Sequence, residues 1–337
     1  MMKRNLKITI LIALSTMLGS CNPTETALPV SYGEVDQVLW VVSDLQRTIE
    51  GYELLGFNQV NQLGEIRLHA GQVPREAGIR LAAANLGGAR VNWVEPVDPS
   101  SLFSDYLETH GEGAMALIHR FPDKKQVRQE IKRLKSLGID VLDQLSFEVM
   151  GEQVPYVLMD TGEEGKYILG FTWGEHGSAL FDGLESRNRH ALKLNQYAFA
   201  IRDPEPVSDF WSSMGLPPLE ISHPELGSPM YYGEPADHEL IQGWQRHGSI
   251  AYEWCIPVKP PIVYEDHINL HGEGIHHLAF SVNEMDPVLD DFRSRGFVVS
   301  MGGTWGESGK PGSGRYEYID LEQTGGVTME LLWNYRE

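Results

Sequence analysis

The stretch His110-Gly111-Glu112-Gly113 recurs in this chain as His271-Gly272-Glu273-Gly274, 161 residues later. Further matches keep nearly the same distance along the chain: Gln37 with Gln196, Trp93 with Trp254, Tyr156 with Tyr316, and Trp173 with Trp333. A nearly constant offset over this length indicates one ancestral unit of about 160 residues that is present twice. The sequence therefore predicts two domains of the same fold.

Each half contains a smaller repeat of its own. A short apolar run is followed by an acidic residue near a helix start, an amphipathic stretch and a closing glycine. The four runs are 35–42, 114–121, 194–201 and 275–282, and the closing glycines are Gly56, Gly138, Gly215 and Gly296. Further strand-like segments follow each glycine. The pattern predicts an α+β protein built from four strand–helix–strand–strand–strand (βαβββ) units, with helices on one face of mixed sheets.

The composition fits such a folded protein and argues against one class of partner. The chain has 337 residues, of which 42% are hydrophobic and 22% charged, which is typical of globular domains with their own cores. Its formal net charge of −20 repels phosphate backbones. We therefore expect no nucleic acid partner.

The beginning of the chain has the layout of a secretory signal. Lys3, Arg4 and Lys7 precede an apolar run over residues 8–18, which is too short to span a bilayer permanently. The run ends in Leu18-Gly19-Ser20-Cys21, which resembles the bacterial lipobox, whose cysteine thiol receives a diacylglycerol. The alternative is an ordinary signal followed by an ordinary cysteine.

The lipobox resemblance implies a signal peptide over residues 1–20, a lipid anchor at Cys21 and a tether over residues 21–32. Asn22 follows the cysteine where an aspartate would retain the protein in the inner membrane, which points to the outer membrane. We therefore expect a bacterial cell envelope lipoprotein that faces the periplasm or the exterior. Its one remaining cysteine, Cys255, then has no disulfide partner within the chain.

The four units resemble a known superfamily. Four βαβββ units, one of which opens with Gly274-Ile275-His276-His277-Leu278-Ala279-Phe280, resemble the vicinal oxygen chelate proteins over nearly all of residues 33–337. This superfamily includes glyoxalase I, methylmalonyl-CoA epimerase, extradiol dioxygenases and bleomycin-binding proteins. The resemblance implies two half-open barrels, at 33–176 and 191–337, joined by a linker at 177–190. It also implies a divalent metal in the cup of a barrel, held by residues of the first and fourth strands of each unit.

In the second half, these positions carry Gln196 and His277 on first strands and Glu253 and Glu330 on fourth strands. This set resembles that of glyoxalase I and implies one divalent ion, which can be Zn, Ni, Co, Mn or Fe. Each residue alone has an ordinary explanation, such as a surface glutamine or a hydrogen-bonded core histidine. Their joint occurrence favours a metal site. Other candidates for lining the cup are Trp211, Tyr231, Tyr232, Trp305, His271 and Arg315.

In the first half, the same positions carry Gln37, Asn92, Ala116 and Gly170. Ala116 and Gly170 cannot coordinate a metal through their side chains. We therefore expect a degenerate first domain that has a structural role or covers the cup of the second.

The resemblance also implies a class of reaction. A substrate with vicinal oxygens can chelate the metal, which then stabilises an enediolate as a Lewis acid. By resemblance to glyoxalase I and the epimerases, Glu330 is the catalytic base and Glu253 the second choice. This predicts a metal-dependent isomerase, epimerase or lyase that acts on a small oxygenated molecule outside the cytoplasm.

Two alternatives remain open. The first is an Fe(II) extradiol-type dioxygenase, although such enzymes normally use two histidines and one carboxylate, and Gln196 takes one histidine position. The second is a protein that sequesters a ligand in the cup without catalysis, as bleomycin-binding relatives do.

Overall fold

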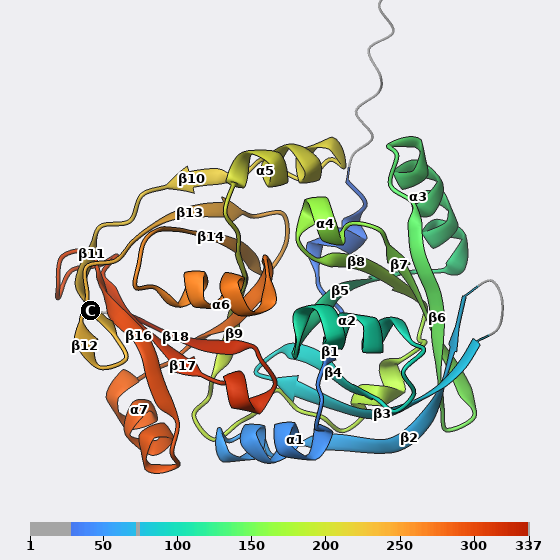
Figure 1. Cartoon of the computed structure of the whole chain (residues 1–337), viewed down its shortest axis with the longest axis horizontal. Helices are drawn as coiled ribbons and strands as arrows, with labels where there is room; N and C mark the ends of the chain where they lie inside the picture. The colour runs from blue at the N-terminus through green and yellow to red at the C-terminus, as the bar shows by residue number, and fades with distance from the viewer. Residues whose placement is uncertain (1–27, 72–74, 336–337) are drawn as a thin grey trace, which may run out of the picture.

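The computed structural model describes residues 28–71 and 75–335, which form two sheet domains side by side (Figure 1). Each domain contains two βαβββ units, so the predicted α+β class and the fourfold repeat are confirmed. The predicted signal peptide and Cys21 lie outside the described residues. Within the described residues, no helix is both long and apolar enough to cross a membrane.

The strands of the first domain form a closed barrel in the order β1-β4-β3-β2-β6-β7-β8-β5. Its elements are β1 (Gln37–Val41), α1 (Leu45–Leu54), β2 (Val60–Ala70), β3 (Arg75–Leu86), β4 (Ala89–Pro96), α2 (Leu102–His110), β5 (Gly113–Phe121), α3 (Lys124–Ser136), β6 (Val141–Val149), β7 (Glu152–Met159), α4 (Gly162–Gly165) and β8 (Ile168–Trp173). The barrel closes because β2 pairs with β6 as well as with β3.

The strands of the second domain form an open, curled sheet in the order β10-β13-β14-β9-β15-β18-β17-β16-β11-β12. Its elements are β9 (Lys193–Ala200), α5 (Pro204–Ser213), β10 (Glu220–Ser222), β11 (Leu226–Tyr231), β12 (Glu234–Pro235), β13 (Glu239–Gln245), β14 (Ala251–Lys259), α6 (Val263–His271), β15 (Gly274–Ser281), α7 (Met285–Ser294), β16 (Val298–Trp305), β17 (Gly314–Asp320) and β18 (Thr328–Asn334). Short 3-10 helices are η1 (Val30–Gly33), η2 (Ser178–Phe181) and η3 (Glu322–Thr324).

Only the second domain is therefore half-open, whereas we expected two half-open barrels. The difference arises at the second strand of each domain. In the second domain this strand is divided into β10, which pairs with β13, and β11, which pairs with β16. Pro224 lies between the two pieces and has no backbone N–H to donate to a neighbouring strand. The division leaves the cup of this domain accessible.

The helices follow the pattern predicted from the sequence. All four closing glycines lie directly beyond a helix end with positive φ, from 87° at Gly138 to 101° at Gly56. This left-handed conformation favours glycine because it has no Cβ. Aspartate side chains accept a backbone N–H at the start of three of the four helices, α1, α3 and α5. The connecting helices α2 and α6 were not predicted; each ends in one copy of the repeated His-Gly-Glu-Gly motif.

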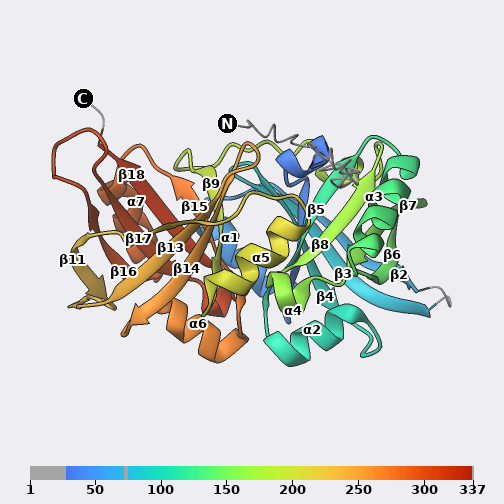
Figure 2. The ribbon, with the colours of Figure 1, turned by 90° about the horizontal axis from the view of Figure 1, so that it is seen from above.

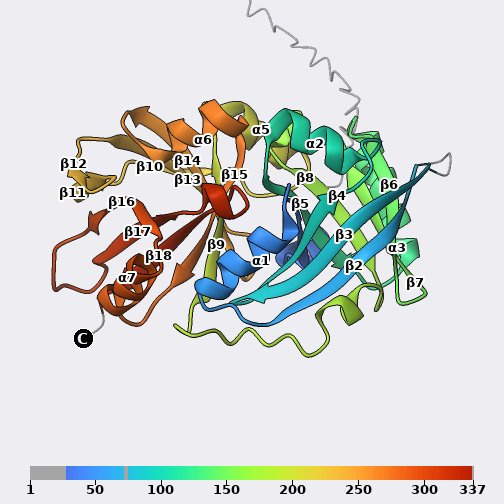
Figure 3. The same ribbon diagram turned by 60° about the horizontal axis from the view of Figure 1, so that its bottom comes forward.

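The two domains pack against each other through a continuous hydrophobic core. Tyr167 of the first domain stacks on Trp211 of α5 at 4.5 Å between ring centroids. Trp40 of β1 donates from its indole nitrogen to the main-chain oxygen of Gly325, at 2.7 Å. Figures 2 and 3 show α2 and α6 next to each other along one side of this interface, where they are in contact. The interface therefore fixes the first domain against the strands that carry the second domain's cup.

Candidate metal centre

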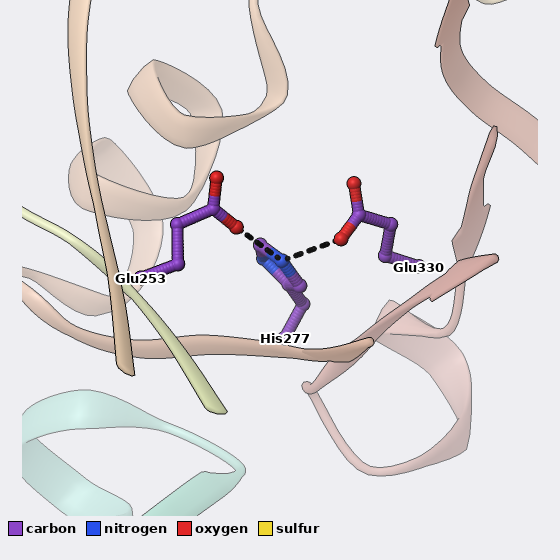
Figure 4. A group of neighbouring side chains, drawn as sticks. All are labelled: Glu253, His277 and Glu330. Atoms are coloured by element: carbon purple, nitrogen blue, oxygen red, sulfur yellow. Dashed lines mark ion pairs between the residues drawn. The ribbon is translucent and has the colours of Figure 1, made fainter. Parts of the chain in front are cut away.

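A buried cluster of Glu253, His277 and Glu330 lies at the floor of the second domain's cup. One potential ligand atom of each residue lies within 4.8 Å of the others. The two carboxylates approach the His277 ring from opposite sides (Figure 4). The Nε2 atom of His277 lies 3.3 Å from Oε2 of Glu330 and 3.6 Å from Oε2 of Glu253. The structure thus brings together three of the four predicted ligands in one group.

The strand register explains why these residues meet. β9 and β15 are antiparallel neighbours at the centre of the sheet, β14 runs parallel to β9, and β18 runs parallel to β15. Glu253 is paired with Ala198, two residues beyond Gln196, and Glu330 is paired with Ala279, two residues beyond His277. Because side chains alternate along a strand, residues two apart share a face. Both units therefore place their pair on the concave face.

Gln196, the fourth predicted ligand, is buried beside the same carboxylates. Its Nε2 atom donates to Oε2 of Glu253 at 2.5 Å and lies 3.3 Å from Oε2 of Glu330. The amide thus lies across the space between the two carboxylates. With the amide turned over, Oε1 faces the same space as an oxygen donor.

His276 precedes His277 directly, and in a regular strand the two side chains would face opposite sides of the sheet. The structure places a bulge in β15 between Ile275 and His277, and the side chains of both histidines are buried. Their Nδ1 atoms lie 2.7 Å apart, so one ring donates to the other. His276 is not a member of the carboxylate cluster. The contact with His276 orients the His277 ring so that its Nε2 atom faces Glu253 and Glu330.

The protonation of the cluster follows from burial and close charges. Burial favours the neutral imidazole, but the two carboxylates outweigh it and raise the pKa of His277 to about 9. Burial also raises the pKa of Glu330; His277 opposes this effect, and the like charge of Glu253 adds to it. A proton on His277 therefore offsets part of the negative charge that the two glutamates place in the core.

The residues present fit a divalent cation. Nε2 of His277 is buried without a hydrogen-bond partner, although two carboxylate oxygens face it. An imidazole nitrogen, two carboxylates and an amide oxygen are donors that Zn, Ni, Co, Mn and Fe accept. Gln196, Glu253, His277 and Glu330 are therefore the residues that would hold such an ion.

Three further residues support the cluster and were not found from the sequence. Gln242 of β13 donates from Nε2 to Oε1 of Glu253 at 2.6 Å. Tyr318 of β17 is the register partner of Glu330, and its hydroxyl lies 2.7 Å from that of Tyr264 in α6. Gln242 is one of three polar residues in β13, with Glu239 and Gln245, so the sequence does not single it out. Its role depends on the register of β13 against β14.

Above the cluster, the cup is a cavity of about 710 Å³ with mainly apolar and aromatic walls. The apolar and aromatic lining includes Leu226, Leu240, Trp244, Met301, Trp305, Tyr316 and Leu332. Of the six further candidates, Trp305 lines the cup and Trp211 lies in the core. His271 lines a separate cavity between the domains. Tyr231 and Tyr232 donate to Asp266 and Asp320, and Arg315 to Glu317 and Asp286.

The corresponding place in the first domain lacks a metal-binding set. Asn92 donates to Oε1 of Gln37 at 2.7 Å, so this pair remains in contact as its counterpart does. Tyr156 donates to the same oxygen at 2.8 Å. At Gly170, the counterpart of Glu330, a Cβ would overlap with Cδ1 of Ile118. Apolar side chains thus fill the space that the cup occupies in the second domain.

Comparisons with known proteins agree with this fold. Residues 195–314 match the model of the glyoxalase/bleomycin resistance protein/dioxygenase superfamily. A mutant of 4-hydroxymandelate synthase from Streptomyces coelicolor is 14% identical, over 90% of this chain and 94% of that chain, with a TM-score of 0.55. A halotolerant catechol dioxygenase is 13% identical, over 90% of this chain and 87% of that chain, with a TM-score of 0.49. The family match and the first likeness confirm the resemblance to the vicinal oxygen chelate superfamily.

Proposed function

We propose that this vicinal oxygen chelate protein holds one divalent cation with Gln196, Glu253, His277 and Glu330, and that it is a metal-dependent isomerase, epimerase or lyase. The observation that carries the proposal is the buried cluster, in which two carboxylates face one imidazole nitrogen. Burying two carboxylates side by side is costly unless their charge is neutralised. A divalent cation neutralises both, and the carboxylates therefore favour its binding.

The substrate in this proposal is a small molecule with vicinal oxygens, such as an α-hydroxycarbonyl compound. A divalent cation in this place supplies Lewis acidity, which favours an enolate over its keto form. The side chains of the site position the substrate and move the proton. The apolar and aromatic walls of the cup would contact the body of the substrate.

Glu330 is the proposed base that removes the proton beside the substrate carbonyl. Its carboxylate lies at the floor of the cup, where it lines the cavity that would hold the substrate. Glu253 is the second choice because Gln242 donates to its Oε1. This bond holds the Glu253 carboxylate in one orientation.

A second candidate is an Fe(II) dioxygenase, which is favoured by the match of residues 195–314 to a superfamily that includes dioxygenases. Non-haem iron oxygenases commonly bind iron with two histidines and one carboxylate. The cluster here has one histidine and two carboxylates, with Gln196 beside them. Sequestration of a ligand in the cup, without catalysis, is the third candidate.

We also propose that the site works in the bacterial cell envelope, on a substrate that reaches the periplasm or the exterior. The support for this proposal is the sequence alone: the charged and apolar segments followed by Leu18-Gly19-Ser20-Cys21. Lipid attached at Cys21 would be the contact with the membrane, most simply the outer membrane.

The function is tested by solvent-deuterium wash-in beside the carbonyl of α-hydroxycarbonyl compounds, with oxygen consumption followed in parallel. The proposal predicts exchange without oxygen uptake, and a loss of about 10²- to 10⁴-fold in Glu330→Gln, because the amide accepts no proton. Metal content is measured for each protein, since the amide retains an oxygen donor. Oxygen uptake with catechols would support the dioxygenase, and a metal-loaded protein that is inert in both assays would support sequestration.

A further inference from the structure

We propose that the substrate of this site carries an anionic group, most simply a carboxylate, at the end opposite its chelating oxygens, and that Arg246 binds it at the rim of the cup. This inference rests on the proposed function, because it assumes that the other end of the substrate lies at the Glu253, His277 and Glu330 cluster. It assigns Arg246 a role in specificity and restricts the shape of the substrate.

A row of side chains connects the cluster with the rim. Every second residue of β13 shares one face of the sheet, and on this face lie Leu240, Gln242 and Trp244. Arg246 follows directly after the strand. All four residues line the cup. Gln242 contacts Glu253 at the floor, whereas Arg246 lies at the turn that leads into β14. A ligand that extends from the floor along this row therefore passes an amide, an indole and then a guanidinium group.

Arg246 is held in place but its donors are not used up. Its guanidinium carbon lies 4.6 Å from the centroid of the Trp244 ring, as in a cation–π contact. The nearest carboxylate oxygen belongs to Glu220 at 3.7 Å, which is longer than a hydrogen bond, and the Glu220 side chain is 82% exposed. The stack on Trp244 thus fixes a guanidinium whose N–H groups remain available to a ligand.

The charge of the cup selects an anion at this position. Among the described residues that line the cup, Arg246 is the one Lys or Arg, and the ionised groups otherwise include Glu225, Glu253 and Glu330. A planar guanidinium binds a carboxylate through two parallel N–H···O bonds. With Glu253 and Glu330 neutralised by the proposed cation, Arg246 is the basic side chain of this lining that would bind a carboxylate at the rim.

The strand register sets the backbone spacing between the floor and the rim of the cup. Trp244 is the register partner of Glu253, and Arg246 lies two residues further along the chain. Two residues of extended strand span about 7 Å. The indole of Trp244 lies between Gln242, which contacts Glu253, and the guanidinium of Arg246. The substrate therefore has a body between its two polar ends, which lies along Trp244 and the apolar wall.

Two probe molecules test this inference by calorimetric titration of the Co²⁺-loaded mature chain. 4-(Hydroxyacetyl)benzoate has an α-hydroxyketone at one end of a ring and a carboxylate at the other, whereas 2-hydroxyacetophenone lacks the carboxylate. We expect the carboxylate to tighten binding about tenfold, which corresponds to about 1.4 kcal/mol, because water screens part of the attraction to the half-exposed Arg246 side chain. This preference should disappear in Arg246→Ala and increase in Glu220→Gln.

Arg187→Ala is the matched control, since Arg187 is an exposed arginine beside Glu185 in the segment between the domains. It should keep the full preference. Equal binding of the two probes to the wild type, or a preference that survives Arg246→Ala, would overturn the role of Arg246. Titration of the metal-free chain separates the two proposals: probes that bind equally well with and without Co²⁺ contradict chelation at the cluster, whereas the difference between the probes still reports on Arg246.

Discussion

His110 and His271 each bind the main chain of the other, so the two copies of the repeated motif meet at the domain interface. Nδ1 of His110 lies 3.0 Å from the carbonyl oxygen of His271, and Nδ1 of His271 lies 2.6 Å from that of His110. Each ring N–H donates to the carbonyl that ends the opposite helix, α2 or α6. The two copies of the motif thus make the same contact in both directions across the interface.

The first prediction concerns the pH dependence of this interface. Burial lowers the pKa of His271, but Glu322 at 2.9 Å and the carbonyl of His110 more than compensate, so the pKa is raised. The protonated form therefore stabilises the fold fully below about pH 6.5, and this contribution is lost as the pH rises through the raised pKa. His271→Gln should flatten the dependence of the unfolding free energy on pH in this range.

The expected size is no more than about 1 kcal/mol, because the Glu322 side chain is 38% exposed and water screens the pair. Urea unfolding of the wild type and the variant from pH 5.5 to 8.5 measures it. His223→Gln, at an exposed position, is the control and should keep the wild-type slope. A His271→Gln protein with an unchanged slope would contradict the role of His271.

The second prediction concerns the filled barrel of the first domain. Gly170→Ala should destabilise the protein by about 1–3 kcal/mol, because the new methyl group overlaps with Cδ1 of Ile118. Ile118→Val removes that atom, so the double variant should recover part of the loss. Chemical denaturation of the two single variants and the double variant measures the coupling. Additive losses would show that Ile118 does not occupy this space.

The third prediction concerns Gln242, which contacts Glu253 rather than the proposed metal. Gln242→Leu should weaken divalent metal binding by about 10- to 100-fold, as is typical when a partner of a metal ligand is removed. Gln245→Leu is the control, because Gln245 lies in the same strand but donates to the carbonyl of Pro217. Competition with a chelator of known affinity measures both variants. Equal affinities in the two would remove Gln242 from this role.

The repeated sequence pattern predicted the fold because the strands and helices of each unit are encoded by residues that lie close together in the sequence. An apolar strand, a capped helix and a glycine with positive φ are encoded within about 20 residues, and all four closing glycines occur as predicted. Closure of the first barrel was not predictable in this way. It depends on the pairing of β2 with β6, which are far apart in the sequence. The second domain stays open because its equivalent strand is divided at Pro224.

The candidate site was also predictable from the sequence only in part. Gln196, Glu253, His277 and Glu330 came from strand positions, and the structure brings them together. Gln242 was missed, since a polar residue in a strand reveals its partner only when the register is known. The bulge at His276 also disturbs the simple alternation that assigns a face to each residue.

The fourth prediction concerns the predicted anchor. Cys21→Ser should leave an unprocessed or soluble precursor, because no other thiol near the start of the chain can accept the lipid. Cell fractionation, with metabolic labelling by a fatty acid, measures the change. A control with Cys255→Ser should remain in the membrane fraction. Membrane association of Cys21→Ser at the wild-type level would contradict lipidation at this residue.

The metal site is tested most directly by the divalent metal content of the mature chain after loading and removal of free ions, measured by elemental analysis. We expect about one ion per chain in the wild type and none in His277→Ala/Glu330→Ala. His69→Ala/Glu148→Ala removes a matched pair from the first domain and should retain the ion. Metal bound equally well by a folded His277→Ala/Glu330→Ala protein would contradict the site described here.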